Sequence, residues 1–479
     1  MFQRILIANR GEISCRIIRA CREMGIATVA IYSEGDATSP HLEMADDRVC
    51  VGPAKSAESY LNMEAIIQAA EQTSCNAIHP GYGFLAENAL FAELCEQAKM
   101  TFIGPPASAI RSMGDKATAR ETMRQAGLPV IPGSQGTLSS PEEGLEVAKE
   151  IGFPVLLKAT AGGGGKGMRR VDHAEEFTAK FREAAFEAEK AFGNPELYLE
   201  KYIIDGRHIE FQVMADAHGR VVHLGERECS AQRRHQKLLE ESPSPVMDAV
   251  TRAELGERLC IALRLVGYRN AGTVEFFRDP GGHLYFMEVN ARLQVEHPVT
   301  EMVSGRDLVV EQIRIAANER LSFTQEDVQL TGHAIECRIN AEDPFDDFRP
   351  SPGVIERFEL PPDTLPNMHA DTAGDAGADA GARAVGGVSA GAGAALVRVR
   401  VDTHVRAGYR IPPHYDSMIA KVITWGPTRE HARQGMVAAL SRFTIEGVKT
   451  TIPVHLRILE DPQFISGQYD TGFLGRLLR

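Results

Sequence analysis

The chain has 479 residues, of which 43% are hydrophobic and 24% are charged, and its formal net charge is −13. This length suffices for about three domains, and the acidic balance argues against general binding to nucleic acid or to an anionic membrane. Every apolar run is far shorter than the roughly 20 residues of a membrane span, including the run near the N-terminus. We therefore expect a soluble, cytoplasmic protein. Because the chain as a whole is acidic, any phosphate-binding site must be a local basic pocket.

Eight cysteines are scattered along the chain, with no Cys-x-x-Cys pair and no Cys/His cluster of zinc-binding spacing. In a large chain this pattern is typical of reduced, buried, structural cysteines, which fits a cytosolic setting.

The first 113 residues combine short apolar strands with amphipathic helices. We predict a strand over 4–8, a helix over 13–24 that Gly25 ends, and a second strand over 28–32. This β-α-β order predicts a parallel sheet with a right-handed crossover. The first turn lacks the G-x-G-x-x-G fingerprint, so we expect a doubly wound domain without the usual dinucleotide.

Residues 76–84 run from a strand into a turn that contains Tyr82 and Gly83. Open α/β sheets place ligands at the carboxyl ends of their strands, so these two residues are candidates to border a site. An ordinary tight turn explains the same residues equally well.

A new domain is predicted to open with a helix at residues 114–116. A strand over 154–158 leads into 161–168, Ala-Gly-Gly-Gly-Gly-Lys-Gly-Met. Glycines after a strand can lay backbone N–H groups against phosphate oxygens, although a linker would have a similar composition. The loop lacks the Gly-Lys-Ser/Thr ending of a Walker A motif.

Two further segments carry candidate ligand contacts. The strand predicted over 197–203 contains Glu200, Lys201 and Ile203, which could line an adenine through a carbonyl, an amide and an apolar contact. Residues 232–237 then pack four basic side chains into six positions of an acidic protein. This run is either a solvated face or a site for polyphosphate and a small acid.

The stretch 287–298 is the most informative one, because its polar residues occupy every second position: Glu288, Asn290, Arg292, Gln294 and Glu296. An extended segment would place them on one face, as in any half-buried strand. The Asp-Pro-Gly-Gly at 279–282 predicts a hairpin over 273–290 with a two- or four-residue loop. Glu275 would then face Phe286 and lie diagonal to Glu288, roughly 7–8 Å away.

Two carboxylates held that close repel each other unless a cation lies between them. Glu275, Glu288 and Asn290 therefore predict a hard divalent ion, Mg²⁺ or Mn²⁺. At about 3.3 Å per residue, a straight strand would put Glu296 roughly 26 Å from Glu288. We expect the chain to bend after Asn290 or Ala291, which would bring Arg292 and Glu296 back over the metal.

The remainder is predicted to be a third domain. Residues 332–340 alternate as a strand, short strands and turns follow, and helices are expected near 428–443 and 469–478. Residues 370–395 are almost wholly Ala, Gly and Asp, a composition that predicts a flexible surface insertion over about 365–397.

These motifs occur in the order IANRGEI, HPGYGFLAEN, MGDK, KATAGGGGKGM, EKYI, ERECSAQRRHQK, EVNARLQVEHPVTE and ECRINAEDP. The chain thereby resembles the biotin carboxylase component of biotin-dependent carboxylases, in the ATP-grasp superfamily. The resemblance implies an α/β fold in three parts. These are an N-terminal doubly wound parallel-sheet domain (1–113), a central ATP-grasp domain (114–332) with a mobile lid over about 131–203, and a C-terminal β-rich domain with closing helices (333–479).

The resemblance also implies the site residues. ATP would contact Lys116, Lys158, Gly164, Gly165, Glu200, Lys201, Tyr202, Ile203, His208, Gln232, His235, Glu275 and Glu288, with Thr471 near the adenine. Mg²⁺ would be held by Glu275, Glu288 and Asn290. Bicarbonate would meet Lys237, Arg292 and the Val295 backbone. Biotin would meet Tyr82, Gly83, Gln294 and Arg338, and the catalytic residues would be Glu296, Arg292, Arg338 and Lys237.

The implied reaction is ATP-dependent carboxylation of biotin through carboxyphosphate, with Glu296 as the general base. The chain contains no Met-Lys-Met, so biotin would arrive on a separate biotin carboxyl carrier protein. The resemblance further implies carboxyltransferase subunits as partners, a role in fatty acid biosynthesis as part of acetyl-CoA carboxylase, and a homodimer. Arg16, Arg19 and Glu23 are candidate dimer contacts, or else an ordinary solvated helix face.

Alternatives remain open at this stage. The chain could serve a propionyl-CoA, pyruvate or related carboxylase, be another ATP-grasp ligase, or be a nucleotide-binding scaffold that has lost catalysis. Two features depart from the family pattern, namely the 365–397 insertion and Thr451, which stands where asparagine is expected.

Overall fold

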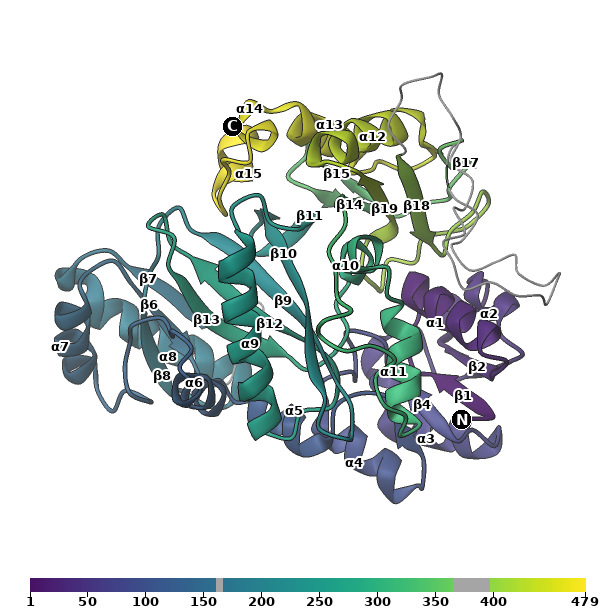
Figure 1. Cartoon of the computed structure of the whole chain (residues 1–479), viewed down its shortest axis with the longest axis horizontal. Coiled ribbons are helices and arrows are strands. Elements are labelled where there is room, and N and C mark those ends of the chain that lie inside the picture. Colours follow the sequence, from purple (N-terminus) through teal and green to yellow (C-terminus); the bar gives the residue numbers. More distant parts are fainter. Residues whose placement is uncertain (161–166, 363, 365–396) are drawn as a thin grey trace.

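The computed structural model describes residues 1–160, 167–362, 364 and 397–479. Three sheets of three or more strands organise these residues, with helices packed around them (Figure 1). The predicted phosphate-binding glycines Gly164 and Gly165 lie outside the described residues, as does nearly all of the predicted insertion.

The N-terminal part is a five-stranded parallel sheet in the order β3-β2-β1-β4-β5. Its strands are β1 (Arg4–Ile7), β2 (Ala27–Tyr32), β3 (Asp47–Cys50), β4 (Ala77–His79) and β5 (Thr101–Phe102). Its helices are α1 (Gly11–Glu23), α2 (His41–Met44), α3 (Met63–Gln72), α4 (Ala89–Gln97) and α5 (Ala107–Gly114). The predicted doubly wound parallel sheet is confirmed, and α1 begins two residues earlier than predicted.

One of the three candidate dimer contacts on α1, Arg16, does not lie on the surface of the chain. The Arg16 side chain is buried, and its Nη2 lies 2.9 Å from Glu301 Oε1 and 2.7 Å from Asp307 Oδ2. Arg16 therefore forms ion pairs within its own chain and is not part of an exposed contact face. Glu23 is exposed and Arg19 is half-buried.

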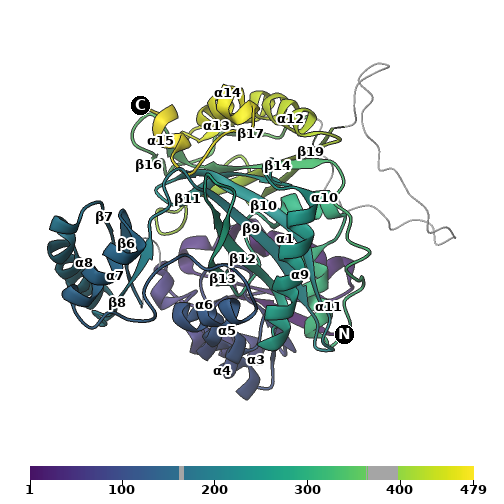
Figure 2. The same ribbon diagram turned by 60° about the vertical axis from the view of Figure 1, so that its left-hand side comes forward.

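A small unit stands to one side of the molecule (Figures 1 and 2). It is a three-stranded antiparallel sheet, β7-β6-β8, with two helices packed on it. The elements are α7 (Pro141–Ile151), β6 (Val155–Ala159), β7 (Met168–Val171), α8 (Phe177–Phe192) and β8 (Leu197–Lys201). It has its own apolar core, and it falls within the predicted lid, so we call these elements the lid unit. Helix α6 (Lys116–Gln125) precedes it and is capped by Asp115.

The largest sheet has eight strands in the order β13-β12-β9-β10-β11-β14-β19-β18, and every neighbouring pair is antiparallel. The strands are β9 (Arg207–Ala215), β10 (Val221–Arg233), β11 (Gln236–Ser242), β12 (Asn270–Arg278), β13 (Leu284–Asn290), β14 (His333–Asn340), β18 (Arg398–Thr403) and β19 (Met418–Gly426). Because β11 pairs with β14, one sheet runs across the predicted domain boundary at residue 332. Residues of the central and C-terminal parts can therefore share one site.

Helices pack around this sheet, and the described residues also form two separate two-stranded ladders. The helices are α9 (Ala249–Leu265), α10 (His297–Ser304), α11 (Leu308–Ala316), α12 (Arg429–Arg442), α13 (Ile452–Glu460), α14 (Pro462–Ile465) and α15 (Phe473–Leu477). The ladders pair β15 (Glu342–Asp343) with β16 (Arg349–Pro350), and β17 (Arg357–Glu359) with β20 (Thr444–Glu446). The predicted helix at 428–443 is confirmed as α12. The predicted helix at 469–478 is only the short α15, and α13 and α14 were not predicted.

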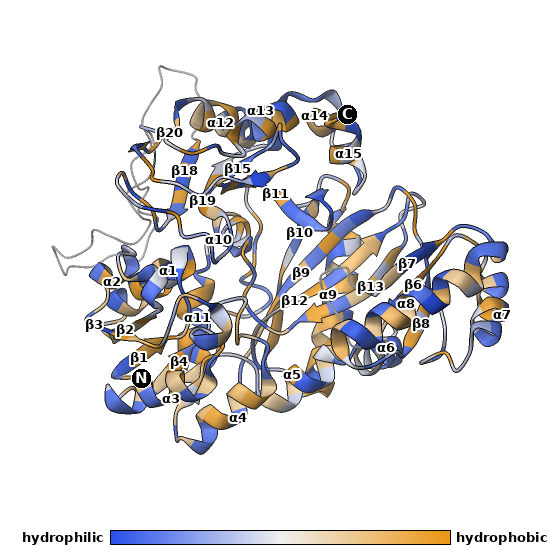
Figure 3. Cartoon of the chain, turned by 180° about the vertical axis from the view of Figure 1, so that it is seen from behind, coloured by the Kyte–Doolittle hydropathy of each residue, from blue (hydrophilic) through white to orange (hydrophobic). Residues whose placement is uncertain are grey.

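Hydrophobic residues concentrate on strands of the large sheet such as β12 and β13, while α6 presents hydrophilic residues (Figure 3). Seven of the eight cysteines are buried, but Cys50 is exposed, contrary to expectation. None of the helices within the described ranges is both long and apolar enough to cross a bilayer.

Candidate active site

A cavity of about 750 Å³ opens where the N-terminal, central and C-terminal parts meet. It is lined by many of the predicted site residues: Tyr82, Gly83, His208, His235, Lys237, Glu275, Glu288, Asn290, Arg292, Gln294, Val295, Glu296 and Arg338. The structure thus brings the metal, bicarbonate and biotin predictions together in one place.

The predicted hairpin is confirmed as β12 and β13, but its register differs from the prediction. The loop has five residues, 279–283, because Arg278 pairs with Leu284. An odd loop alone would turn Glu275 and Glu288 to opposite faces. A bulge at Met287 shifts the register by one more residue, so Glu275 lies directly opposite Glu288 instead of diagonal to it.

The predicted bend after Asn290 is also confirmed. Strand β13 ends at Asn290, and the chain turns so that Glu296 Oε1 lies 2.6 Å from Lys237 Nζ. The same Nζ is 3.2 Å from Glu275 Oε1, and Asn290 Nδ2 donates to that oxygen at 2.9 Å. The two acids of the hairpin and the acid beyond the bend therefore share one small volume.

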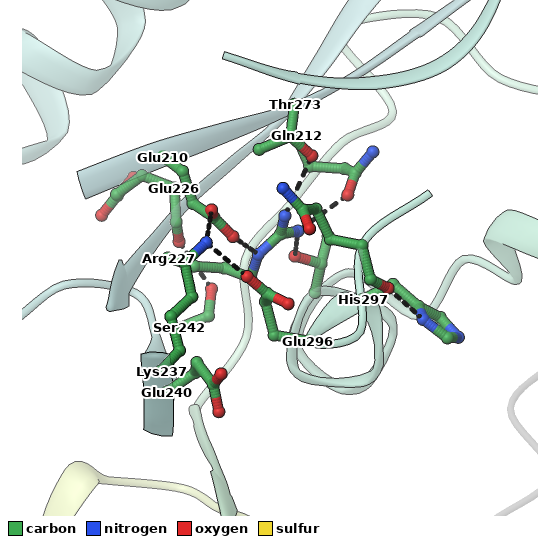
Figure 4. Close-up of polar contacts among 12 residues, drawn as sticks. Glu210, Gln212, Glu226, Arg227, Lys237, Glu240, Ser242, Thr273, Glu296 and His297 are labelled. Atoms are coloured by element: carbon green, nitrogen blue, oxygen red, sulfur yellow. Dashed lines mark hydrogen bonds and ion pairs between the residues drawn. The ribbon is translucent and has the colours of Figure 1, made fainter. Parts of the chain in front are cut away.

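Lys237 is the centre of this arrangement (Figure 4). Its Nζ donates to Glu210 Oε2 and to Glu296 Oε1, each at 2.6 Å. Behind Glu210 lies Arg227, which is completely buried and donates to Glu210 Oε1 at 2.5 Å. Burial alone would lower the pKa of Lys237, but the carboxylates of Glu210, Glu275 and Glu296 raise it well above its usual range.

Arg227 is held by neutral partners as well as by Glu210. Its guanidinium donates to Gln212 Oε1 at 2.7 Å, to Thr300 Oγ1 at 2.9 Å and to Thr273 Oγ1 at 3.1 Å. A buried cation with this many partners has little freedom to move. We call Glu210, Arg227, Lys237 and Glu296, with strands β9, β10 and β11, the cavity floor.

Arg338 binds Glu296 from the opposite side. Its Nη2 lies 2.9 Å from Glu296 Oε2, and its Nε donates to Glu240 Oε1 at 2.7 Å. Burial alone would raise the pKa of Glu296, but Lys237, Arg338 and Arg227 hold it well below its usual range. Glu296 is therefore ionised. Burial, together with the charge on Glu296, raises the pKa of Glu240 to about 7 despite Arg338.

Arg292 is positioned by an acid that the sequence analysis did not select. Glu87 Oε2 accepts from Arg292 Nε at 2.7 Å, while Glu87 Oε1 accepts from the Ala291 backbone N–H at 2.9 Å. Arg292 Nη1 donates to Gln294 Oε1 at 2.7 Å. Glu87 lies in the HPGYGFLAEN motif, so the N-terminal part helps to hold the bend in place.

The basic run 232–237 forms a tight turn that borders the cavity. Gln232 pairs with Lys237 and Arg233 with Gln236, which leaves a two-residue turn at Arg234 and His235. Both have positive φ, 48° and 67°, as a type I′ turn requires. Arg233, His235 and Lys237 line the cavity, and both Arg233 and Arg234 form ion pairs with Asp347.

The predicted adenine contacts lie apart from the cavity lining, on the lid unit and its connection to β9. The Glu200 carboxylate binds both Lys158 Nζ and Arg120, whose Nη1 is 2.8 Å away. Lys201 Nζ donates to the carbonyl oxygens of residues 152 and 153 at 2.9 and 3.0 Å. The Arg170 guanidinium stacks over the Tyr202 ring at 4.6 Å.

The remaining predicted nucleotide residues differ in their surroundings, and of those that follow, His208 lines the cavity. Ile203 is half-buried, Gln232 is buried, and Lys116 Nζ is 3.8 Å from Glu288 Oε2. His208 Nε2 lies 3.0 Å from Glu275 Oε2, whose charge raises the pKa of His208 although burial opposes this. The Thr471 backbone N–H donates to the carbonyl of residue 206, at the start of β9. The lid unit thus carries one set of predicted nucleotide contacts and the cavity another.

The acids of the hairpin fit the predicted divalent ion. Partial burial and the neighbouring Glu275 charge raise the pKa of Glu288, although Lys116 and Lys158 lower it. The local cations thus leave part of the repulsion between the two acids uncompensated. Carboxylate and amide oxygens from Glu275, Glu288 and Asn290 are the ligands that Mg²⁺ prefers.

Comparison with known proteins agrees with this geometry. Residues 1–110 match the family model described as "Biotin carboxylase, N-terminal domain", and residues 379–476 match "Biotin carboxylase C-terminal domain". Residues 115–324 match "Carbamoyl-phosphate synthase L chain, ATP binding domain". "Biotin carboxylase 1" of Bacillus subtilis is 54% identical over 475 residues, which cover 99% of this chain and 98% of that protein. The chain belongs to the biotin carboxylase family.

Solved structures show that the ATP-grasp biotin carboxylase fold is shared throughout. The biotin carboxylase domain dimer of Hydrogenobacter thermophilus 2-oxoglutarate carboxylase, in complex with MgADP, ADP and bicarbonate, has a TM-score of 0.89 and 48% identity. The match covers 100% of this chain and 99% of the Hydrogenobacter chain. The biotin carboxylase of Campylobacter jejuni, in a beta-gamma-ATP complex, also has a TM-score of 0.89, with 45% identity and 99% coverage of both chains. The predicted family and fold are therefore confirmed.

Proposed function

We propose that the chain carboxylates biotin with ATP and bicarbonate, and that it does so at the cavity described above. The observation that best supports this proposal is the position of Glu296. This buried, ionised acid lies between Lys237 Nζ at 2.6 Å and Arg338 Nη2 at 2.9 Å. A carboxylate between two cations can accept a proton while its neighbours hold anions. The full-length relatives named biotin carboxylase support the same reaction.

The first step in this proposal is proton removal from bicarbonate. Lys237 and Arg292 attract the anion, and the Val295 backbone fixes its orientation next to Glu296. Glu296 then takes the proton, which makes the bicarbonate oxygen nucleophilic enough to attack the γ-phosphorus of ATP and form carboxyphosphate. Mg²⁺ held by Glu275, Glu288 and Asn290 would neutralise phosphate charge during this attack. Lys237 contributes a second, fixed positive charge on the same side.

The second step is transfer of CO₂ to biotin. Carboxyphosphate breaks down in the closed cavity, and the released phosphate can remove the biotin N1 proton. Arg338 then stabilises the negative charge that develops on the ureido oxygen, while Tyr82, Gly83 and Gln294 border the biotin. Arg338 is pre-oriented for this task by Glu240 and Glu296.

Nucleotide binding is divided between the two sets of contacts. Glu200, Lys201, Tyr202 and Ile203, with His208, Gln232 and His235, would surround the nucleoside, and Lys116 and Lys158 would meet its phosphates. Closure of the lid unit over the cavity would exclude water and protect carboxyphosphate from hydrolysis.

We further propose the biological setting. Biotin would be presented by a biotin carboxyl carrier protein, and carboxyltransferase subunits would complete an acetyl-CoA carboxylase in the cytoplasm. A homodimer is supported by the biotin carboxylase domain dimer of the related 2-oxoglutarate carboxylase. Relatives that serve other acceptors include the small subunit of that enzyme, 49% identical to this chain. The carboxyltransferase that co-purifies would identify the final acceptor.

The direct test is transfer of labelled bicarbonate to free biotin. The wild-type chain should form carboxybiotin only when ATP, Mg²⁺, bicarbonate and biotin are all present. The Arg338→Met variant should still hydrolyse ATP in response to bicarbonate but should transfer almost no label. Wild-type ATP hydrolysis that ignores bicarbonate would contradict the proposal and favour another ATP-grasp ligase.

A further inference from the structure

Lys421 is a fully buried cation on β19 to which the proposed mechanism assigns no task. Its Nζ donates to the backbone carbonyl of Val295 at 2.8 Å, directly before Glu296. The same Nζ lies 3.0 Å from Glu12 Oε1, on the first turn of α1. A single side chain of the C-terminal part therefore contacts both the N-terminal part and the bend that carries the proposed base.

Glu12 extends this connection to the other end of the cavity. Its Oε1, the oxygen next to Lys421, also accepts a hydrogen bond from the Tyr82 hydroxyl. Lys421 Nζ lies 5.9 Å from the centre of the Tyr82 ring, within cation–π range. We call Tyr82, Glu12, Lys421 and Val295 the cross-domain chain. It runs from a proposed biotin contact to a proposed bicarbonate contact.

The surroundings of Lys421 leave it few alternative positions. Its neighbours across the sheet are Arg338 on β14 and Asp402 on β18, and Asp402 Oδ2 lies 3.9 Å from its Nζ. Glu12 and Asp402 are both buried. A buried ammonium group is costly unless it stays paired, so Lys421 must keep its acidic partners and its carbonyl acceptor together. A change at one partner therefore acts on the others.

We infer that Lys421 is a positioning residue that couples biotin at Tyr82 to bicarbonate at the Val295 backbone. The inference rests on the proposed function. When biotin draws the Tyr82 hydroxyl, Glu12 loses one donor and binds Lys421 more tightly, which shifts the Val295 carbonyl and the peptide that leads to Glu296. Coupling of this kind is reciprocal, so each substrate changes the affinity for the other by the same factor.

The test measures the KM for bicarbonate in ATP hydrolysis at saturating MgATP, with and without free biotin. In the wild-type enzyme we expect biotin to change this KM about fivefold or more, the lower range of measured couplings. In Lys421→Met the KM for bicarbonate should rise about tenfold, and biotin should no longer change it. The KM for ATP should stay within about twofold, because Lys421 contacts none of the predicted nucleotide residues within the described part of the chain.

Two milder variants keep the test decisive if Lys421→Met does not fold. Glu12→Gln keeps the shape but removes the charge, and Tyr82→Phe removes only the hydroxyl. Each should reduce the effect of biotin on the KM for bicarbonate. In variants that fold, Tyr82→Phe and Lys421→Met should be non-additive, because they interrupt the same chain.

Arg429→Met is the matched control. It removes a cation of the C-terminal part from a buried acid, Glu241 on β11, but Arg429 contacts none of the cross-domain chain among the described residues. It should reduce stability without changing the effect of biotin. A folded Lys421→Met enzyme with the wild-type response, or additive Tyr82 and Lys421 variants, would overturn the inference, as would a wild-type KM for bicarbonate that biotin leaves unchanged. Loss of bicarbonate-dependent ATP hydrolysis in the wild-type chain would instead overturn the proposed function.

Discussion

The cavity floor and the lid unit carry charges in opposite ways. On the floor, Glu210, Arg227 and Glu296 are fully buried, and each binds at least two partners. On the lid unit, Glu200 is buried beside Lys158 and Arg120, but the ion pair on its outer face, between Arg169 and Glu187, leaves 36% and 35% of the two side chains exposed. The floor is therefore held rigidly by its charges, whereas the lid unit is held by its own apolar core.

This difference suggests how the two regions share the reaction. Proton transfer from bicarbonate requires fixed charges in a dry site, and the floor provides them before any substrate binds. Nucleotide exchange requires a part that can move as a unit. The lid unit stands to one side and joins the rest through a few contacts, among them Arg120 to Glu200 (Figure 2). The predictions that follow run from the largest expected effect to the smallest.

Removal of the most buried floor cation should have the largest effect. Arg227→Met would leave the Glu210 carboxylate buried without one of its two cations, and breaking a buried pair costs about 3–5 kcal/mol. Urea denaturation at neutral pH should show this loss of unfolding free energy, or the variant should fail to fold. A loss below about 1 kcal/mol would show that the floor is not held by its charges.

Acid should weaken the floor strand β11 before it affects the lid unit. Burial alone would raise the pKa of Glu241, but Arg429 and His333 lower it to about 2. A folded pKa below the ordinary value of 4.5 stabilises the protein above pH 4.5, and this is lost as the pH falls from 4.5 toward 2. The contribution is about 3 kcal/mol.

The measurement is urea denaturation at pH 7, 4 and 3. The wild-type chain should lose more unfolding free energy between pH 7 and pH 3 than Glu241→Gln does. Equal losses in both proteins would show that Glu241 does not contribute to the acid sensitivity.

A metal-ligand variant tests the hairpin acids. Glu288→Gln removes a charge from the proposed Mg²⁺ site, and the Mg²⁺ concentration for half-maximal ATP hydrolysis should rise at least tenfold, about 1.4 kcal/mol. Asp279→Asn, in the loop of the same hairpin, is the control and should leave the Mg²⁺ response unchanged. A normal Mg²⁺ titration for Glu288→Gln would place the metal elsewhere.

The smallest effect is expected on the lid unit. Arg169→Met removes a half-exposed ion pair, and such pairs contribute about 0–1 kcal/mol because water and salt screen them. Denaturation of this variant should nearly overlay that of the wild type. A loss as large as that of Arg227→Met would remove the distinction between the two regions.

The fold and the bend could be predicted from the sequence because their signals are local. Alternation marked the strands, and the distance between Glu288 and Glu296 required a turn after Asn290. The register could not be predicted. The five-residue loop and the bulge at Met287 each reverse the face to which Glu288 points relative to Glu275, so their effects cancel. The alternation of polar and apolar residues shows neither feature.

The residues that were missed have partners far away in the chain. Glu87 binds Arg292 and Lys421 binds Val295, so neither can be recognised from its neighbours in sequence. Glu210 had a signal, since it lies two residues after His208 in an alternating strand and therefore shares its face. Thr451, a departure from the family pattern, accepts from the Asn340 backbone N–H at 3.0 Å and donates to the Arg338 carbonyl at 2.9 Å. Threonine at this position therefore supports the strand that carries Arg338.

The central claim is that Glu296 accepts the bicarbonate proton, and the Glu296→Gln variant tests it most directly. Its bicarbonate-dependent ATP hydrolysis should fall about 10²- to 10⁴-fold, the usual contribution of a general base. Nucleotide affinity, measured separately by titration with MgADP, should change less than about twofold. A Glu296→Gln enzyme that binds nucleotide normally and still hydrolyses ATP with the wild-type response to bicarbonate would contradict the account.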